Sequence, residues 1–409
     1  MFEWSEEHQM IREAVKRFVD DEIRPHVEAL EHGDLPPYDI LRKLFATFGM
    51  DAMARDRFQK QIAREKAVAA GEVEATPAKE RSGGDSGMSL IPIIELCRVC
   101  PGMVTAMGVS MGLTSAAIMS KGTTAQKERW ALDLLTMDKV GAWAITEPGS
   151  GSDAFGSMKS TARRDGDDYI LNGSKTFITN GPYADTTVFI CKLDEGNAPE
   201  DRKVLSFVLD RGMPGFVQSK PLRKMGMHSS PTGELFFDNV RLTPDRLLGE
   251  TENHRGGDGR DSAREGFVLE RVGVAALSLG IINECLRLSV DYAKNRVLWG
   301  QPISEFQLIQ QKIARMEVAR INVQNMVFNA IERVQAGKLP SLAESSAMKL
   351  YSSEAATDVA MDAVQLFGGN GYMAEYRVEQ LARDAKSLMI YAGSNEIQTL
   401  HVARGVLGT

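Results

Sequence analysis

The spacing of apolar residues changes twice along the chain. Near the N-terminus, Val15 and Phe18 follow at helical spacing after Ser5, a residue type that favours helix N-caps, and a second helical region covers about 90–135. From about 141–248 the apolar residues alternate with polar ones, which is the period of strands. The pattern therefore predicts a helical first third followed by a β middle third.

Short strand-like runs are expected within the middle third at 186–193, 204–209 and 234–242. The dipeptides Asp165-Gly166 and Asn172-Gly173 are of the kind that favours two-residue hairpin turns. The middle third is therefore expected to be a small β domain.

Helical spacing returns after about residue 266. One apolar stripe predicts a long helix, which Gly337 and Pro340 would end. The stripe consists of Ile309, Ile313, Met316, Val323, Val327, Ala330 and Val334. An order of helices, then strands, then helices indicates segregated layers rather than an alternating parallel sheet, so the predicted fold class is α+β.

Three domains are predicted: an all-α N-terminal domain over 1–138, a β domain over 139–250 and a C-terminal helical domain over 251–409. Two segments look like insertions because they are charged and rich in Gly and Ser. Residues 51–88 are expected to form a charged helix followed by a loop, and 250–262 to form a loop.

The composition is that of an ordinary globular protein, with 43% hydrophobic and 25% charged residues. A net charge of -7 without a strongly basic run argues against an electrostatic nucleic-acid binder. The start of the chain lacks the features of a signal peptide, and no 18 apolar residues are contiguous, so we expect a cytoplasmic protein without a membrane span. The close pair Cys97 and Cys100 favours a structural role over a redox or zinc site.

The segment 143–153, WAITEPGSGSD, combines glycines that allow close backbone approach, hydroxyls that donate hydrogen bonds and a proline that fixes a turn. Alone, such a segment is more often an ordinary loop. A nearby strand, however, carries Phe177 and Thr179 two residues apart, so that an aromatic face and a hydroxyl lie on one side. Together these features suit the side of a flat heterocycle.

The C-terminal third carries three more motifs, RVLWGQPI at 296–303, QLFGGNGY at 365–372 and IYAGSNE at 390–396. An arginine near glycines suits a pyrophosphate, and the G-G-N-G segment can bring backbone N–H groups close to an anion. An ordinary helix-ending turn is the alternative for 368–371. Neither the arginine motif at 296–303 nor the G-G-N-G motif has the spacing of a Rossmann fingerprint or a Walker A loop. This disfavours a nucleotide bound in those ways.

With these five motifs in order, the chain resembles the acyl-CoA dehydrogenase family over nearly its whole length. The resemblance implies an all-α N-terminal domain, a β-barrel or sandwich middle domain and a C-terminal four-helix bundle, assembled as a homotetramer. It also implies FAD as the cofactor, an acyl-CoA as the substrate and an electron-transferring flavoprotein as the partner that accepts electrons. No metal site is implied.

Carried over position by position, the resemblance implies a composite FAD site in which the ADP half is held across a subunit boundary. The FAD-binding positions are Trp143, Ile145, Thr146, Ser152, Phe177, Thr179, Arg296, Phe306, Gln307, Gln365, Gly368, Gly369, Ser394 and Glu396. Among them, Phe177 and Thr179 correspond to an aromatic wall and a hydroxyl beside the flavin. Ser152, Arg271 and Gly393 correspond to substrate contacts.

The catalytic position departs from the commoner pattern of the family. Many members have Y-E-G-T there, the Glu being the base that removes the α proton, whereas this chain has Ala392 in place of that Glu. A subset resembling isovaleryl-CoA and long-chain acyl-CoA dehydrogenases carries the carboxylate in an L-E-R segment, and Leu269-Glu270-Arg271 occurs at that place. We therefore expect Glu270 to be the base, and the backbone N–H of Ala392 to stabilise the thioester oxygen. The alternative is that Glu270 is a solvated glutamate on a helix surface.

The implied reaction oxidises the Cα–Cβ bond of an acyl-CoA to a trans-2-enoyl thioester, with the β hydrogen leaving as hydride to flavin N5. An acyl-CoA oxidase is a weaker alternative because this chain is short for one. A catalytically silent acyl-CoA or flavin-binding protein is another, against which Glu270 speaks. The relocated base and the segment 51–88, which replaces a loop over the acyl pocket of relatives, favour a branched, cyclic or longer acyl chain.

Overall fold

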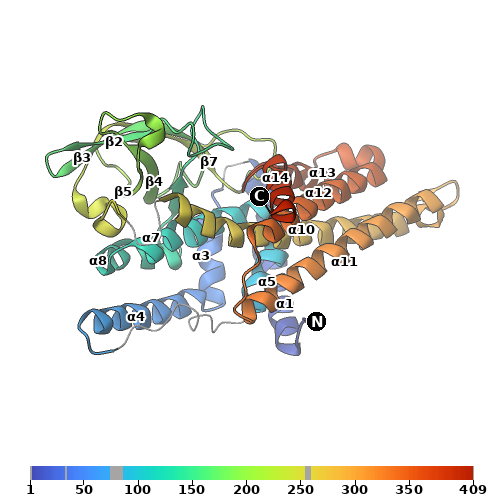
Figure 1. Cartoon of the computed structure of the whole chain (residues 1–409). Coiled ribbons are helices and arrows are strands. Elements are labelled where there is room, and N and C mark those ends of the chain that lie inside the picture. The colour runs from blue at the N-terminus through green and yellow to red at the C-terminus, as the bar shows by residue number, and fades with distance from the viewer. Residues whose placement is uncertain (1, 33–34, 74–85, 254–258, 409) are drawn as a thin grey trace.

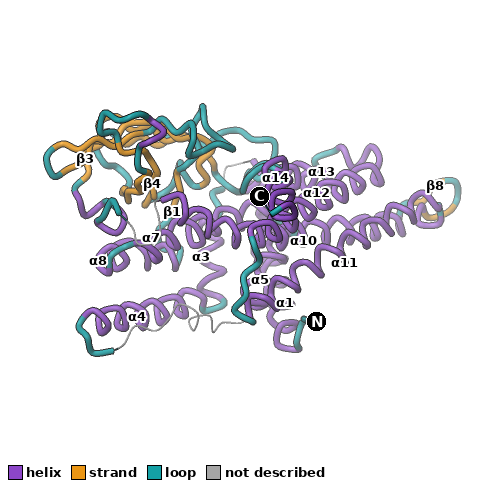
Figure 2. The backbone as a smooth tube through the Cα atoms, viewed as in Figure 1, coloured by secondary structure: helices purple, strands orange, loops and turns teal. Residues whose placement is uncertain are grey.

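The computed structural model describes residues 2–32, 35–73, 86–253 and 259–408. The strands gather in one layer, and the longest helices pack beside it as a bundle (Figures 1 and 2). This is the acyl-CoA dehydrogenase-like α+β architecture that the sequence predicts, with strands between two sets of helices.

The N-terminal part is helical throughout its described residues. Its elements are α1 (Glu6–Phe18), η1 (Val19–Ile23), η2 (Arg24–His26), α2 (Val27–His32), α3 (Tyr38–Thr47), α4 (Met50–Ala69), α5 (Ser86–Cys97), α6 (Pro101–Gly108), η4 (Val109–Ser115), α7 (Ala116–Lys121), α8 (Thr124–Gln126), η5 (Lys127–Ala131) and α9 (Leu132–Leu135). The Ser5 side chain caps α1 by accepting a hydrogen bond from the His8 N–H, as expected. The charged helix predicted within 51–88 is α4, whereas the loop predicted after it falls largely outside the described residues.

The middle part forms a seven-stranded sheet in the order β1-β4-β2-β3-β7-β6, with β5 also paired to β4. The elements are β1 (Gly141–Ala144), β2 (Thr161–Asp165), β3 (Asp168–Thr179), β4 (Thr186–Leu193), η6 (Pro199–Asp201), β5 (Val204–Asp210), β6 (Phe216–Gln218), β7 (Thr232–Leu242), η7 (Pro244–Arg246) and η8 (Leu248–Glu250). The turn predicted at Asp165-Gly166 joins the antiparallel strands β2 and β3 and is confirmed.

The turn predicted at Asn172-Gly173 is wrong. Both residues lie inside β3, which runs on to Thr179 and pairs with β7 along its length. The register with β7 shifts between Leu171 and Gly173, so the glycine marks a bulge. A Cβ at Gly173 would meet the Ser160 side chain at 2.2 Å, which explains the glycine by close packing instead of by a turn.

The C-terminal part consists of long helices and one short hairpin. Its elements are α10 (Gly259–Asn295), β8 (Val297–Leu298), β9 (Gln301–Pro302), η9 (Ile303–Glu305), α11 (Gln307–Gln335), α12 (Leu342–Phe367), η10 (Gly368–Tyr372), α13 (Val378–Ser387) and α14 (Asn395–Leu407). The long predicted helix is α11, which ends before Gly337. The G-G-N-G segment forms η10, so the helix-ending turn is the observed conformation.

The loop predicted at 250–262 is shorter than expected. Helix α10 begins at Gly259, and 254–258 lie outside the described residues. Residues 259–262 join the helix despite their Gly and Asp content because extending an established helix costs far less than starting one.

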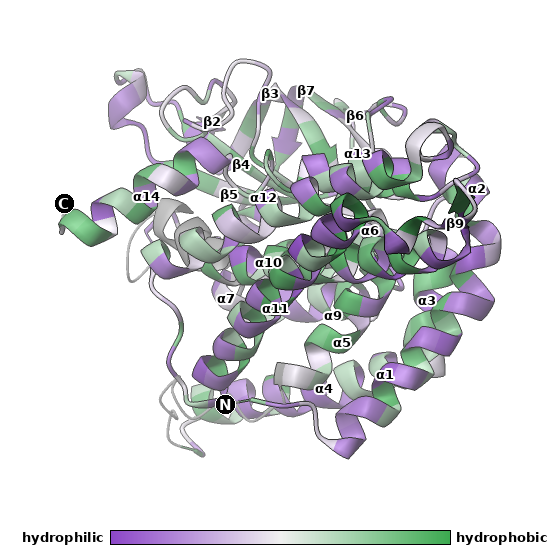
Figure 3. Cartoon of the chain, turned by 90° about the vertical axis from the view of Figure 1, so that its right-hand side faces the viewer, coloured by the Kyte–Doolittle hydropathy of each residue, from purple (hydrophilic) through white to green (hydrophobic). Residues whose placement is uncertain are grey.

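Three apolar cores hold these parts together. The largest joins the N-terminal helices to the C-terminal bundle, and the central helices α5 and α10 carry much of its hydrophobic colour in Figure 3. A second core fills the β layer. In the third, Phe58 and Ile62 of α4 pack with Trp130 and with strand residues such as Val188 and Val208. The charged helix α4 is thus anchored to the β part by its apolar side.

Two helical stretches, Pro101–Lys121 and Glu270–Asn295, are long and apolar enough to pass a length and hydropathy test for membrane spans. In their apolar windows 50% and 72% of the residues are buried inside the fold. The second stretch in particular is packed as the core helices of globular proteins are, so the test alone is weak support for a span.

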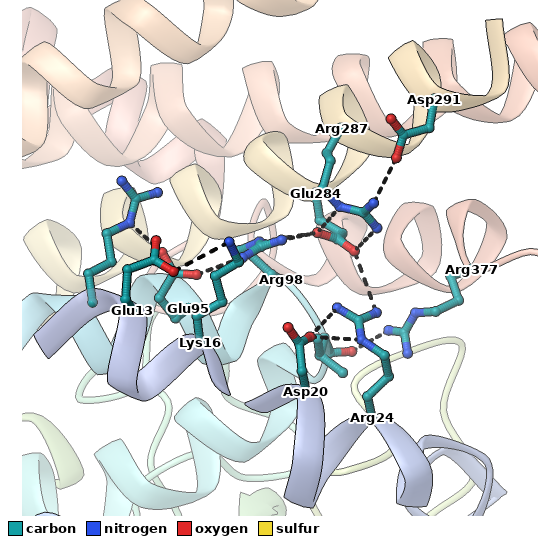
Figure 4. Close-up of polar contacts among 12 residues, drawn as sticks. Glu13, Lys16, Asp20, Arg24, Glu95, Arg98, Glu284, Arg287, Asp291 and Arg377 are labelled. Carbon is teal, nitrogen blue, oxygen red and sulfur yellow. Dashed lines mark hydrogen bonds and ion pairs between the residues drawn. The ribbon is translucent and has the colours of Figure 1, made fainter. Parts of the chain in front are cut away.

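A network of charged side chains connects the first and last parts of the chain (Figure 4). Arg98, in the turn after α5, donates to Glu284 of α10 at 2.8 Å and to Glu95 at 2.8 Å. Arg287 also donates to Glu284, at 2.7 Å, while an Arg24 guanidinium nitrogen lies 3.6 Å from the same carboxylate. Burial opposes ionisation of Glu284, but the hydrogen bond from Arg287 and the charge of Arg98 outweigh it and lower its pKa to about 2.

Candidate active site

A cavity of about 670 Å³ lies where the β layer meets the helices, with walls from α6, β3, α10 and the segments around α13 and α14. It brings together ten of the residues that the sequence predicts for the site. These are Trp143, Ile145, Thr146, Ser152, Phe177, Thr179, Glu270, Arg271, Ala392 and Gly393. They come from the middle and C-terminal parts of the chain, and the N-terminal part adds Thr105, Val109 and Leu113 to the lining, so the fold assembles the cavity.

The Gly and Ser loop at the cavity wall is held from behind by a buried ion pair. Nζ of Lys175, which has no exposed surface, donates to Oε1 of Glu147 at 2.8 Å and to the Ile145 carbonyl at 2.9 Å. Glu147 also accepts from the backbone N–H groups of Lys159 and Ser160, at 2.7 and 3.0 Å. Burial opposes the charge of Glu147, yet Lys175 and these donors lower its pKa. The loop is therefore rigid enough to present its outer residues to a ligand.

Phe177 lies on a distorted section of β3. Its φ of 57° is left-handed, and the register with β7 shifts between Lys175 and Ile178. The side chain is 69% exposed although the ring belongs to the cavity wall, and Thr179 lines the same wall. A large exposed ring inside a cavity is a surface on which a flat ligand can stack.

Glu270 lies in the first third of α10 and lines the cavity. Burial raises the pKa of its carboxyl group from 4.5 to about 7, although the charges of Arg271 and Lys349 act in the opposite direction. A carboxylate with a pKa near neutrality inside a cavity is suited to accept a proton. The alternative of a solvated surface glutamate does not fit this position.

Arg271 is 3% exposed and also lines the cavity. Its Nη1 donates to Oγ of Ser346 at 3.1 Å, and Ser346 in turn donates to the Leu342 carbonyl at 2.6 Å. The guanidinium is thus fixed to α12 while it contributes positive charge beside Glu270.

The turn at Ala392 and Gly393 forms another section of the wall. Both residues have left-handed backbones, with φ of 57° and 82°. Within the described part of the chain, the N–H of Ala392 donates to no acceptor. It is therefore available to a ligand oxygen in the cavity.

The remaining predicted FAD positions lie outside the cavity. Ser394 and Glu396 follow directly at the start of α14, where Glu396 is exposed. Six others cluster around the β8–β9 hairpin and the end of α12, at the end of the bundle away from the β layer (Figure 2). These are Arg296, Phe306, Gln307, Gln365, Gly368 and Gly369. One chain by itself does not bring them to the cavity.

Several lining residues were missed by the sequence analysis, including Thr105, Leu113, Lys224 and His401. Lys224 is the most informative, because burial lowers its pKa to about 8. The sequence could have revealed Lys175, the lysine paired with Glu147 behind the loop. It is a charged residue at a strand position where the pattern requires a buried one.

Three family models account for almost the whole chain. The acyl-CoA dehydrogenase N-terminal domain matches residues 5–54 and 49–138, the middle domain matches 142–240, and the C-terminal domain matches 257–407. The chain belongs to the acyl-CoA dehydrogenase family. This is a family of FAD-dependent oxidoreductases, and the present chain is accordingly an enzyme of that family.

Similar acyl-CoA dehydrogenases differ in the acyl group for which they are named. The chain is 35% identical to an acyl-CoA dehydrogenase of Bacillus subtilis over 99% of both chains. It is 31% identical to the butyryl-CoA dehydrogenase structure of Megasphaera elsdenii, with a TM-score of 0.85 and 100% of both chains covered. It is 32% identical to the isovaleryl-CoA dehydrogenase of Oryza sativa, over 97% of this chain and 90% of the relative. Overall identity therefore does not select one acyl group.

Proposed function

We propose that this enzyme oxidises the Cα–Cβ bond of an acyl-CoA thioester to the trans-2-enoyl thioester, with FAD as the electron acceptor and Glu270 as the base. The observation that carries the proposal is the composition of one cavity wall. Glu270, the exposed ring of Phe177 and the available N–H of Ala392 all line the same space. A base, a stacking surface and an oxyanion donor are the parts that α-proton removal from a thioester requires.

The residues present fit a flavin. The exposed Phe177 ring offers a face for a flat heterocycle, and the hydroxyls of Thr146, Ser152 and Thr179 supply donors around it. When bound, FAD supplies the two-electron acceptor that the oxidation needs. The ADP half would be held by Arg296, Gln307 and the other remote positions.

The chain's own groups account for proton removal. The Glu270 carboxylate takes the α proton once the substrate lies in the cavity. As negative charge grows on the thioester oxygen, the N–H of Ala392 stabilises it, and this donor needs only the backbone, so loss of the usual Glu side chain there does not remove it. Arg271, tied to Ser346, keeps positive charge beside the carboxylate and lowers the cost of ionising it.

A silent binding protein is a weaker alternative. Such a protein has no use for a carboxyl group in the cavity wall, because ionising it there is unfavourable. The position and raised pKa of Glu270 therefore favour catalysis. An acyl-CoA oxidase shares these groups and differs in its electron acceptor, so it is distinguished by solution measurements.

The remote FAD positions also support a proposal about assembly. We propose that the enzyme is a homotetramer in which these residues serve a cavity on another subunit. Exposed apolar residues such as Trp299, Leu308, Val318 and Tyr372 near this end of the bundle favour a subunit interface. Electron-transferring flavoprotein as the oxidant of the reduced enzyme, and a cytoplasmic location, are part of the same proposal.

One experiment tests the central proposal. The purified protein should be yellow and hold about one FAD per chain, as expected for the family. It is mixed anaerobically with a panel of straight, branched, cyclic and aryl acyl-CoAs while flavin absorbance is followed. At least one thioester should bleach the flavin and free coenzyme A should not. A colourless protein that FAD does not reconstitute would rule the function out. Rapid reoxidation by air in place of electron-transferring flavoprotein would identify an oxidase.

A further inference from the structure

Two buried side chains hold the carbonyl oxygens of the turn that follows Tyr391. Nε2 of Gln398, on α14, donates to the Ala392 carbonyl at 3.0 Å and to the Gly393 carbonyl at 2.8 Å. Nζ of Lys349, on α12, donates to the same Gly393 carbonyl at 2.9 Å. Both side chains have no exposed surface. Both carbonyls of the turn are therefore held on its protein side.

Lys349 is itself fixed by a second partner. Its Nζ donates to Oδ1 of Asn395 at 2.8 Å, and Oγ of Ser353 donates to the same oxygen at 3.1 Å. Burial lowers the pKa of Lys349 to about 8, with Arg271 acting in the same direction and Glu270 opposing it. The ammonium group is therefore charged at neutral pH and cannot easily move away from its acceptors.

The turn needs such restraint because its backbone is strained. Ala392 has a left-handed φ of 57°, which is unfavourable for an L-residue because its Cβ approaches the following carbonyl oxygen. A Cβ at Gly393 would meet Nε2 of Gln398 at 2.6 Å, so the glycine lets the amide approach the backbone closely. Strain held in place by surrounding hydrogen bonds is typical of functional turns.

We propose that Lys349 and Gln398 are positioning residues for the oxyanion donor: by fixing the peptide planes that follow Ala392, they hold its N–H toward the cavity. The inference rests on the proposed function. Lys349 and Gln398 act through the backbone, because neither side chain is among the described residues that line the cavity. A donor displaced by a fraction of an ångström stabilises the developing charge less.

Lys349 has a second effect that Gln398 lacks. Two cations act on Glu270, Arg271 on its own helix and Lys349 on α12. The phenol of Tyr391 is nearby. Lys349 in turn faces Arg271, Glu270, Glu354 and Glu396. Removing the ammonium takes away one of the two charges that favour ionised Glu270, so its pKa should rise further. Replacing the neutral amide of Gln398 should leave that pKa unchanged.

The test uses the FAD-loaded enzyme and the variants Gln398→Met and Lys349→Met, which keep the side-chain length but remove the donors. Met361→Leu on α12 and Leu400→Met on α14, both at exposed positions, are matched controls. Flavin reduction by the best acyl-CoA of the panel should slow about 10- to 100-fold in both donor variants, with FAD content unchanged. In Lys349→Met alone, the acidic limb of the rate profile should move to higher pH.

A second readout does not depend on turnover. The enoyl-CoA product, labelled with ¹³C at its thioester carbonyl, is bound to each variant, and the carbonyl stretching frequency is measured by difference infrared spectroscopy. In the parent enzyme a well-placed donor lowers this frequency, and in the two variants it should return toward the value in water. If Lys349→Met does not fold, Gln398→Met decides alone, since Gln398 holds both carbonyls.

The outcomes separate this inference from the proposed function. If no acyl-CoA reduces the flavin of the parent enzyme, the function itself is wrong. If the parent is active and both donor variants keep its rate and its carbonyl frequency, the positioning role is wrong. A slower rate explained by lost FAD, with an unchanged frequency, likewise overturns it.

Discussion

Helix α10 carries two glutamates in opposite electrostatic environments. Glu284 is surrounded by the guanidinium groups of Arg24, Arg98 and Arg287, and its pKa is lowered to about 2. Glu270, fourteen positions earlier, lines a cavity, and burial raises its pKa to about 7. The residue type and the helix are the same, so the difference in pKa comes from the surroundings: burial dominates at Glu270, and cationic partners outweigh it at Glu284.

The comparison shows how one helix serves two purposes. The carboxylate of Glu284 is charged at neutral pH and contributes to joining the N-terminal and C-terminal helices (Figure 4). Glu270 has fewer compensating groups, which destabilises its charged form and makes it a stronger base. Stability and reactivity are thus obtained from the same functional group by adding or withholding hydrogen-bond donors.

The largest expected effect comes from removing the reactive carboxylate. Glu270→Gln should bind FAD and acyl-CoA, while the chemical step falls by about two to four orders of magnitude, the range for a lost general base. Single-turnover flavin bleaching measures it. Combining Glu270→Gln with Ala392→Glu moves a carboxylate to the commoner family position and should restore part of the rate. Near-normal flavin reduction in Glu270→Gln alone would make another residue the base.

Glu284→Gln should have the opposite effect, lowering stability and leaving the reaction rate nearly unchanged. The variant leaves the guanidinium groups around it without their anion, and loss of one partner of a buried charge network costs about 3–5 kcal/mol of folding free energy. Denaturant unfolding measures it. Its rate of flavin reduction per folded molecule should stay within about twofold, because the network lies outside the cavity wall. Asp291→Asn, which removes an exposed partner of Arg287, is the matched control and should cost about 1 kcal/mol or less.

The pH dependence of stability should separate the two glutamates by sign. The folded-state pKa of Glu270 is raised, so its contribution is fully present below pH 4.5 and is lost as the pH rises through about 7. Glu270→Gln should therefore gain about 1–3 °C in Tm over the parent between pH 5 and pH 8. The folded-state pKa of Glu284 is lowered, so its contribution is present above pH 4.5 and is lost as the pH falls toward 2. Equal pH profiles for both Gln variants would contradict the assignment.

The smallest effect concerns a cation just beyond the end of α10. Arg296 is predicted to hold the FAD pyrophosphate of another subunit, so Arg296→Ala should raise the FAD dissociation constant about tenfold, roughly the value of one charge-assisted hydrogen bond. Assembly should weaken with it because cofactor and interface are coupled. Analytical ultracentrifugation with and without added FAD measures both. A stable monomer that retains FAD would contradict the composite site.

Sequence patterns predicted the order of the layers and the long helix α11 because apolar periodicity reports burial directly. The Asn172-Gly173 error arose because local turn preference was outweighed by strand pairing with β7 and by packing against Ser160. Glu270 was found through family resemblance and Ala392. The contacts of Glu147 and Lys349 stayed hidden because their partners Lys175 and Gly393 lie 28 and 44 positions away along the chain. Those of Gln398 stayed hidden because the sequence does not show that this glutamine turns back to the carbonyls of the turn before its own helix.

The Arg98 to Glu284 contact also limits how this enzyme can be recombined. The two residues are separated by 186 positions and belong to different matched domains. A chimera that took its first 138 residues from a relative without a cation at position 98 would enclose the Glu284 carboxylate with one donor fewer. When whole domains are exchanged between family members, the charges at positions 98 and 284 therefore have to match. A replaced N-terminal domain should be accompanied by α10 from the same relative.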